Sequence, residues 1–336
     1  MITVGIIGAG RIGRVHAESI SSLVKGAVVK SVADPFMNAE TEKWAKSLGI
    51  GYAVKDYHKI LEDEEIDAVL ICSSTDTHSP ISIEAIKAGK HVFCEKPIDH
   101  DVEKIHAVME ALKGSKVKYQ VGFNRRFDHN FMAVKEAVVS GKIGTPHIIK
   151  ITSRDPEPPG LDYVKVSGGM FLDMTIHDFD MVRFLAGCDA TEIYVQSAVL
   201  VDPLIGEAGD VDTAVITLKM ENGCLAVIDN SRKAVYGYDQ RAEVFGSGGM
   251  VAAANDTAST AVLSTVDGVK GEKPLHFFLE RYMDAYAKEI ECFIDAIENG
   301  KDTPLGVEDG LKPVLMGLAA KKSMAEQRMV KLSEIM

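Results

Sequence analysis

The sequence has few cysteines, no excess of basic residues and no long apolar run. Its five cysteines are odd in number and far apart, so they form neither a disulfide framework nor a zinc-ligand spacing, and we expect free thiols. The formal net charge of −12 argues against a nucleic-acid partner or an anionic membrane, because both repel an acidic surface. No apolar stretch has the length needed to cross a bilayer. We therefore expect a globular cytoplasmic protein with a small-molecule ligand.

The first 123 residues alternate short apolar runs with helical patterns. The predicted strands are Ile2–Ile7, Ala27–Ala33, Ala68–Cys72, His91–Cys94 and Lys118–Gly122. The predicted helices between them are Ile12–Leu23, Asn38–Leu48, Pro80–Ala88 and Val102–Leu112. The first run follows Met1 without the basic segment and cleavage site of a signal peptide, so we expect a strand there. Repeated β-α-β units with apolar strands predict an α/β Rossmann domain over residues 1–123, a parallel sheet with helices on both faces.

After residue 123 the pattern changes, and strands follow one another with only turns between them. The predicted strands are Ile148–Thr152, Ile193–Val201, Ala214–Met220, Leu225–Asn230 and Arg241–Phe245. The predicted helices are Phe127–Ser140, Phe277–Asn299 and Val307–Gln327. We expect residues 124–336 to form an α+β domain with a large, mostly antiparallel open sheet. Successive residues of Thr213–Met220 point to opposite faces of the sheet, and neither set is strongly polar. We therefore expect a helix to cover one face of the sheet and a partner subunit to cover the other.

A glycine-rich turn, Gly8–Gly13, connects the first strand to the first helix. Its pattern is G-x-G-x-x-G, within the β-α-β unit that a dinucleotide-binding turn requires. Gly8 permits the tight turn, Gly10 lets the backbone approach a pyrophosphate, and Gly13 allows close packing of helix and strand. Arg11 and Ile12 begin the helix whose N-terminal amides face the ligand, although a surface role for Arg11 is equally compatible with its position.

Asp34 closes the second predicted strand, 21 residues after Gly13. A carboxylate at this position accepts hydrogen bonds from ribose hydroxyls and repels a 2′-phosphate, so we expect NAD in preference to NADP. Ser73, Thr75 and His78 follow the third predicted strand at the carboxyl edge of the sheet, where ligands bind. We include them among the predicted cofactor contacts, Thr75 and His78 on the nicotinamide side.

Asp173 and His177 are four residues apart in Gly168–Met181, a spacing that places both side chains on one face of a helix. A carboxylate beside an imidazole fixes the ring and balances the charge that the ring acquires as a base. An ordinary pair on a helix surface is the alternative. The rest of the chain favours the catalytic interpretation, since the Rossmann half supplies a hydride acceptor.

Cys94-Glu95-Lys96-Pro97 ends the strand before Val102–Leu112. Together with Gly8–Gly13 and Gly168–Met181, this segment resembles the glucose–fructose oxidoreductase, inositol dehydrogenase and rhizopine-catabolism family over essentially the whole chain. Val121–Asp128 and Asn230–Arg241 bring the likeness nearest to the inositol dehydrogenases of that family. The resemblance implies NAD-linked oxidation of a cyclitol, myo-inositol to its 2-keto form, by a homotetramer.

The same resemblance implies that Lys96, Asp173 and His177 are catalytic. The chemistry agrees: His177 takes the hydroxyl proton, Asp173 holds the ring, and the Lys96 ammonium stabilises the developing alkoxide. Glu95 and Lys96 join the predicted cofactor contacts. The predicted substrate contacts are Lys96, Asn124, Arg126, Asp155, Asp173, Thr175, His177 and Tyr236.

Other functions remain open at this point. Dehydrogenases of scyllo-inositol, D-chiro-inositol or an aldose share the same three catalytic residue types. A dinucleotide-sensing regulator needs none of the three, and an NAD-dependent glycoside hydrolase is compatible with the fold. A zinc alcohol dehydrogenase needs cysteine and histidine ligands at a spacing that this sequence lacks, so we expect no metal.

Overall fold

The computed structural model describes residues 1–335, which divide into two compact units. Unit 1 comprises residues 1–127 and 283–314, and unit 2 comprises residues 128–282 and the chain from Leu315 onward. This division differs from the expected single boundary after residue 123, because a C-terminal helix contributes to the core of unit 1.

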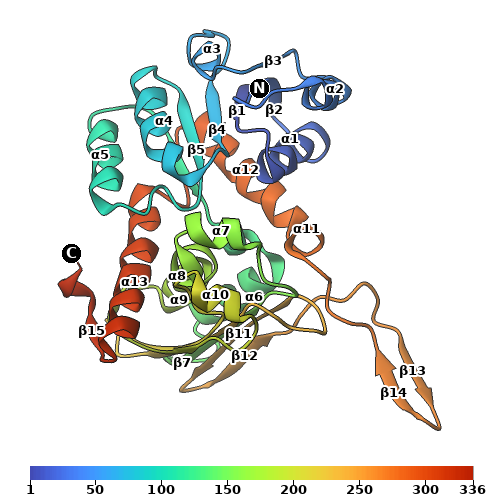
Figure 1. The fold of residues 1–336 in the computed structure, drawn as a ribbon, viewed down its shortest axis with the longest axis vertical. Coiled ribbons are helices and arrows are strands. Elements are labelled where there is room, and N and C mark those ends of the chain that lie inside the picture. Colours follow the sequence, from blue (N-terminus) through green and yellow to red (C-terminus); the bar gives the residue numbers. More distant parts are fainter. Residues whose placement is uncertain (336) are drawn as a thin grey trace. The chain divides into compact units, whose positions relative to one another are not determined.

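Unit 1 is built on a parallel sheet whose six strands have the order β3-β2-β1-β4-β5-β6. Its strands are β1 (Ile2–Ile7), β2 (Ala27–Ala33), β3 (Tyr52–Val54), β4 (Ala68–Ile71), β5 (His91–Glu95) and β6 (Tyr119–Gly122). Its helices are α1 (Arg11–Ser22), α2 (Ala39–Ser47), α3 (His58–Leu61), α4 (Thr75–Lys87), α5 (Val102–Leu112), η1 (Asn124–Phe127), α12 (Met283–Glu298) and the first turns of α13 (Val307–Glu326). Figure 1 shows the helices packed around the strands. The predicted Rossmann fold is confirmed, with its strand order reversing between β1 and β4.

The helix α12 explains why a distant segment joins this unit. It packs against α1 and places Ile290, Phe293 and Ile294 in the hydrophobic core beside Phe93 of β5. Apolar residues at this spacing form one helical stripe, which must be buried against another element. The predicted single helix over Phe277–Asn299 is interrupted at Tyr282, where a short helix ends before α12 begins.

Unit 2 contains a seven-stranded sheet in the order β12-β11-β7-β10-β9-β8-β15. Its strands are β7 (Pro146–Arg154), β8 (Ala190–Ala198), β9 (Thr213–Met220), β10 (Leu225–Ser231), β11 (Asp239–Gly246), β12 (Gly249–Ala253) and β15 (Val330–Lys331). Its helices are α6 (His129–Val139), α7 (Leu161–Val166), α8 (Gly169–Asp173), α9 (Thr175–Ala186), α10 (Pro203–Glu207), α11 (Phe278–Arg281), the rest of α13 and η2 (Leu332–Glu334). Only β7 and β10 pair in parallel, so the predicted, mostly antiparallel sheet is confirmed.

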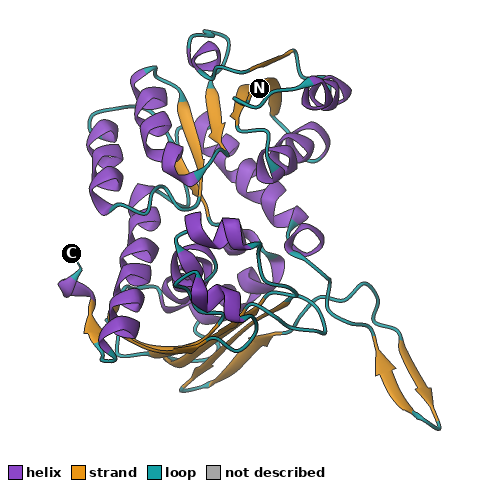
Figure 2. Ribbon diagram, viewed as in Figure 1, coloured by secondary structure: helices purple, strands orange, loops and turns teal. Residues whose placement is uncertain are grey.

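The sheet of unit 2 has two different faces (Figure 2). Helices α6 and α9 pack against one face, where alternate residues of β9 are buried. On the other face the register places Ile148 between Phe245 and Leu225, and these three side chains are 43–52% exposed. This apolar row crosses three strands. Such a row is expected on a sheet face that another protein surface covers.

A two-stranded hairpin, β13 (Val262–Thr265) and β14 (Gly268–Gly271), projects from unit 2 in Figure 1. All of its strand residues are exposed. Among residues 1–335, no helix combines the length and apolar character that crossing a membrane requires.

Candidate functional site

The glycine-rich turn of unit 1 has the geometry of a dinucleotide-binding turn. Gly8 has φ +104°, and a Cβ atom there would lie 2.6 Å from the backbone of Cys72. A Cβ atom on Gly13 would lie 1.9 Å from the Gly8 carbonyl oxygen. At Gly10, the N-cap of α1, no atom lies within 4 Å of the corresponding position, and no side chain caps the helix. A pyrophosphate can therefore approach the N-terminal amides of α1, while Arg11 and Ile12 form its first turn.

Asp34 follows β2 and is fixed against this turn. Its Oδ2 accepts a hydrogen bond from the Ala9 amide at 2.8 Å, and its Oδ1 accepts one from the Phe36 amide at 2.8 Å. Arg14, which was not singled out from the sequence, donates to the Ala9 carbonyl. The carboxylate is thus held beside the turn, as recognition of a ribose requires.

The segment after β4 has a more structural role than expected. Ser73 Oγ and Thr77 Oγ1 are 2.6 Å apart, and Thr75 is the first residue of α4. His78 is 2% exposed, and its two ring nitrogens face the carbonyl oxygens of Pro97 and Ser73. Burial lowers the pKa of His78, but Cys94 and the two carbonyl groups raise it more, to about 9. His78 therefore joins the ends of β4 and β5, and its contact with the nicotinamide stays a prediction.

Glu95 ends β5, and Lys96 follows it. The Glu95 side chain is turned into unit 1, where its Oε1 lies 2.7 Å from His16 Nε2. Glu95 is 8% exposed, so most of its surface is in contact with protein, and its contact with the cofactor stays a prediction. Asn124 and Arg126 lie on η1 in the same unit, where Asn124 is buried and Arg126 donates to Asp309.

In unit 2, Asp173 and His177 do not share one unbroken helix. Asp173 is the last residue of α8, and α9 begins at Thr175. Met174 separates them with φ −91° and ψ −59°, and its carbonyl oxygen accepts the amide of His177 at 3.3 Å. The predicted i, i+4 pair therefore spans a junction between two helices, because the backbone tightens at that point.

Arg232 brings Asp173 and Asp155 together, a contact that was not expected from the sequence. Both terminal guanidinium nitrogens donate to Asp173 Oδ2 at 3.2 Å, and Nη1 lies 3.5 Å from Asp155 Oδ2. Tyr163 donates to Asp173 Oδ1 at 2.9 Å. Arg232 is 3% exposed. Burial lowers its pKa, whereas Asp173, Asp155 and Asp210 raise it, and the net shift is upward. A charged Arg232 thus offsets the negative charge of both carboxylates.

Thr175 is buried and committed to the protein. Its hydroxyl donates to Asn230 Oδ1 at 2.7 Å, and the Asn230 amide donates to Asp178 at 2.8 Å. The hydrogen bond of Thr175 ties the start of α9, two residues before His177, to the end of β10.

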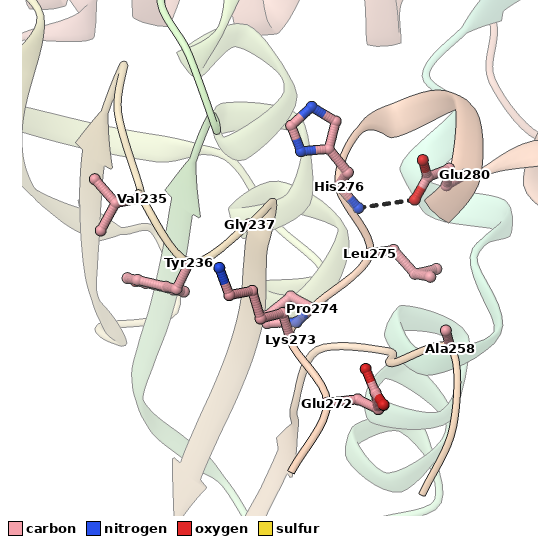
Figure 3. A pocket seen from close by; sticks show the side chains of 10 residues that line it. All are labelled: Val235, Tyr236, Gly237, Ala258, Glu272, Lys273, Pro274, Leu275, His276 and Glu280. Carbon is pink, nitrogen blue, oxygen red and sulfur yellow. Dashed lines mark hydrogen bonds between the residues drawn. The ribbon is translucent and has the colours of Figure 1, made fainter. Parts of the chain in front are cut away.

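Tyr236 belongs to another part of unit 2. Its hydroxyl accepts from Arg154 and donates to Asp239 at 2.6 Å. It also lines a surface pocket of about 300 Å³ at the base of the hairpin, shown in Figure 3. The other lining residues are Val235, Gly237, Ala258, Glu272, Lys273, Pro274, Leu275, His276 and Glu280. Tyr236 is thus the only predicted site residue in this pocket.

Comparisons with known proteins place this geometry in a family. Residues 2–123 match the oxidoreductase family with an NAD-binding Rossmann fold, and residues 131–252 match the GFO/IDH/MocA C-terminal domain. The myo-inositol 2-dehydrogenase of Thermotoga maritima is 50% identical over 99% of both chains. The inositol 2-dehydrogenase of Rhizobium meliloti is 46% identical over 98% of both chains.

A solved structure agrees with these relatives. The scyllo-inositol dehydrogenase of Lactobacillus casei with bound NAD(H) and scyllo-inositol is 30% identical, covers 99% of both chains and has a TM-score of 0.92. The predicted resemblance, the oxidoreductase class and the cofactor NAD are thereby confirmed. This chain belongs to the GFO/IDH/MocA family of NAD-dependent oxidoreductases.

Proposed function

We propose that this protein oxidises myo-inositol to 2-keto-myo-inositol (scyllo-inosose) while NAD is reduced. The observation that carries the proposal is the 50% identity to a myo-inositol 2-dehydrogenase over 99% of both chains. The proposal is also supported by the resemblance to this family, which implies that Lys96, Asp173 and His177 are catalytic. In this reaction the carbinol carbon loses a hydride, the hydroxyl loses a proton, and the products are ketone, NADH and a proton.

The residues around Gly8–Gly13 fit the cofactor. No side chain caps the N-terminus of α1, so a pyrophosphate can approach there, and Asp34 is held where it can accept hydrogen bonds from ribose hydroxyls. When bound, NAD accepts the hydride. Asp34 carries a negative charge that disfavours a 2′-phosphate, so we propose a preference for NAD over NADP.

We propose that His177 is the general base. A neutral imidazole can take the hydroxyl proton at physiological pH, since its ordinary pKa is near 6.5. Asp173 is the neighbouring anion that stabilises the resulting imidazolium. Its own position is set by Arg232 and Tyr163, so these two residues position Asp173 rather than react.

We propose that the Lys96 ammonium donates to the oxygen that is being oxidised and stabilises its alkoxide character. Asp155 is a further candidate contact of the polyol, supported by its ion pair with the arginine that holds Asp173. Asn124, Arg126 and Tyr236 remain proposals for hydroxyl recognition. Thr175 acts through Asn230, because its buried hydroxyl is already bonded there.

We propose that the protein is a homotetramer assembled through the sheet of unit 2. The exposed row of Phe245, Ile148 and Leu225 supports this assembly, because it is the kind of apolar surface that a second copy covers. We also propose a cytoplasmic location in inositol catabolism, supported by five free cysteines.

The test is a steady-state panel of myo-, scyllo- and D-chiro-inositol and glucose, run with NAD and with NADP. We expect NADH formation with myo-inositol to be fastest. His177→Ala should reduce kcat by at least a hundredfold, since general acid–base catalysis contributes about 10²–10⁴-fold. Near-normal turnover of His177→Ala would refute His177 as the general base. Faster turnover of scyllo-inositol than of myo-inositol would make scyllo-inositol the proposed substrate. Absence of NADH formation with every polyol would favour a dinucleotide-sensing regulator over an enzyme.

A further inference from the structure

Unit 1 contains a buried cluster of titratable side chains beneath the end of β5. His16 comes from α1, Glu95 from β5 and Glu289 from α12. They are 0%, 8% and 0% exposed, respectively. His16 Nε2 lies 2.7 Å from Glu95 Oε1. One imidazole nitrogen of His16 and one carboxyl oxygen of each glutamate all lie within 4.8 Å of one another. His16 also packs edge-on against the rings of Phe93 and Tyr286.

Glu289 differs from the other two members because neither of its carboxyl oxygens has a hydrogen-bond partner among the described residues. A carboxylate that is fully buried without a donor or a cation is strongly disfavoured, and such a group becomes neutral instead. Glu95 lies nearby and already accepts from His16. A second negative charge at Glu289 would add repulsion to the loss of hydration.

We propose that Glu289 is a neutral carboxylic acid, and that the His16–Glu95 pair positions the end of β5 for NAD binding. The carboxyl ends of parallel strands form the cofactor edge of a Rossmann sheet, and Lys96 follows Glu95 directly. His16 and Glu289 are therefore positioning residues, and the inference rests on NAD binding rather than on the identity of the polyol.

The surrounding charges agree with this protonation state. Burial is the largest cause that raises the pKa of Glu289 well above its ordinary value, followed by Glu95 and then Cys292 on the same helix. Arg125 and Arg126 lie on η1, which also packs against α12, and they do not reverse the upward shift.

The packing of Glu95 explains how the cluster acts on the cofactor edge. A Cβ atom on Gly122 of β6 would lie 3.1 Å from the Glu95 carboxyl group, so the side chain occupies the space above that glycine. Gly122 lies beneath the Glu95 carboxyl group, His16 lies beside its Oε1, and its Oε2 accepts a hydrogen bond from the Lys96 amide at 3.3 Å. Loss of the imidazole would leave Oε1 without this partner and weaken the hold on the end of β5 that carries Lys96.

The first experiment measures the equilibrium constant for unfolding of wild-type, Glu289→Gln and Glu291→Gln protein at pH 5 and pH 7. Glutamine reproduces a neutral acid in shape, and Glu291 is the control because it lies half-exposed on the same helix, ion-paired to Lys288. A raised pKa in the folded state means that unfolding releases a proton, so stability falls as pH rises above the unfolded pKa. The unfolding constant of the wild type should therefore rise about tenfold per pH unit relative to Glu289→Gln, a hundredfold in all, while Glu291→Gln follows the wild type.

Equal pH dependence in wild type and Glu289→Gln would overturn the protonation state. So would a stoichiometric divalent cation in purified wild-type protein that Glu289→Gln lacks, because the carboxyl group would then be an ionised ligand.

The second experiment measures the Kd for NAD by titration. We expect the control Glu291→Gln to bind NAD within threefold of wild type, His16→Phe to bind at least tenfold more weakly, and His16→Gln, which retains a donor, to recover most of that loss. Unchanged affinity in His16→Phe, or an equal loss in His16→Gln, would overturn the positioning role. Neither experiment uses a polyol, so failure of the proposed substrate would appear separately, as absence of NADH formation in wild type.

Discussion

Replacement of Arg232 tests whether a buried cation holds the carboxylates of unit 2. The substitution Arg232→Met retains most of the side-chain volume and removes the charge and its donors. Arg232 is 3% exposed, and it donates twice to Asp173 while lying 3.5 Å from Asp155. Both carboxylates would then lose their cation at once, and Asp173 would keep the hydrogen bond from Tyr163.

The expected cost is about 3–5 kcal/mol of unfolding free energy, the usual result of removing one partner from a buried ion pair. We place the effect near the lower end, because the Asp155 side chain is 20% exposed and can recover some hydration. The matched control is Arg241→Met. The Arg241 side chain is 44% exposed, and its buried partner Asp239 keeps hydrogen bonds from Tyr236 and Asn255 when the arginine is removed. We therefore expect the control to lose only about 0–1 kcal/mol, the usual contribution of an exposed ion-pair partner.

Urea denaturation of the three proteins at pH 7 measures the difference. We expect a much lower midpoint for Arg232→Met, with a slope equal to that of wild type. A loss below about 1 kcal/mol, or one equal to that of Arg241→Met, would refute the structural role of Arg232, since surface pairs reach that value.

Three further predictions concern the cofactor, pH and assembly. Asp34→Asn should weaken NAD binding by about 1.5–3 kcal/mol through loss of charged hydrogen bonds and should narrow the gap to NADP; an unchanged NAD-to-NADP affinity ratio would contradict this. The pKa of His78, raised to about 9 in the folded protein, means that its stabilisation is present below pH 6.5 and is lost as pH rises through 9. The loss is about 3 kcal/mol in wild type and should be absent in His78→Gln, as measured by denaturation from pH 6 to 9.5. Phe245→Glu places a charge in the exposed apolar row and should yield smaller species by light scattering, whereas an unchanged mass would exclude this row from the interface.

The fold of unit 1 was predictable because its signals are local. The strands are short apolar runs that end in glycine or polar turns, and predicted β1 and β2 coincide with the observed bounds. Strand β3 escaped prediction because it has only three residues, all half-buried. The placement of α12 was not predictable either, since its amphipathic pattern specifies a buried face but not the unit that buries it.

In the candidate site, too, only the features that depend on residues close together in the sequence could be predicted. Gly8, Gly13 and Asp34 lie within one β-α-β unit, so their spacing carries the geometry. The contact between Arg232 and Asp173 joins residues 59 positions apart, and no periodicity in the sequence indicates it. The junction at Met174 was missed because helical spacing assumes an unbroken helix.

Three acidic groups of this protein are each held by a partner that is distant in sequence. Asp34 accepts the Ala9 amide, Glu95 contacts His16, and Asp173 accepts from Arg232. A carboxylate that is partly withdrawn from water stays charged only if fixed donors replace its hydration. These partners therefore fix the acids that we propose for recognition of the cofactor ribose, for the end of β5 and for support of the catalytic base. It follows that replacing a side-chain partner, His16 or Arg232, should impair activity as clearly as replacing the acid that it holds, even if that partner does not contact a ligand.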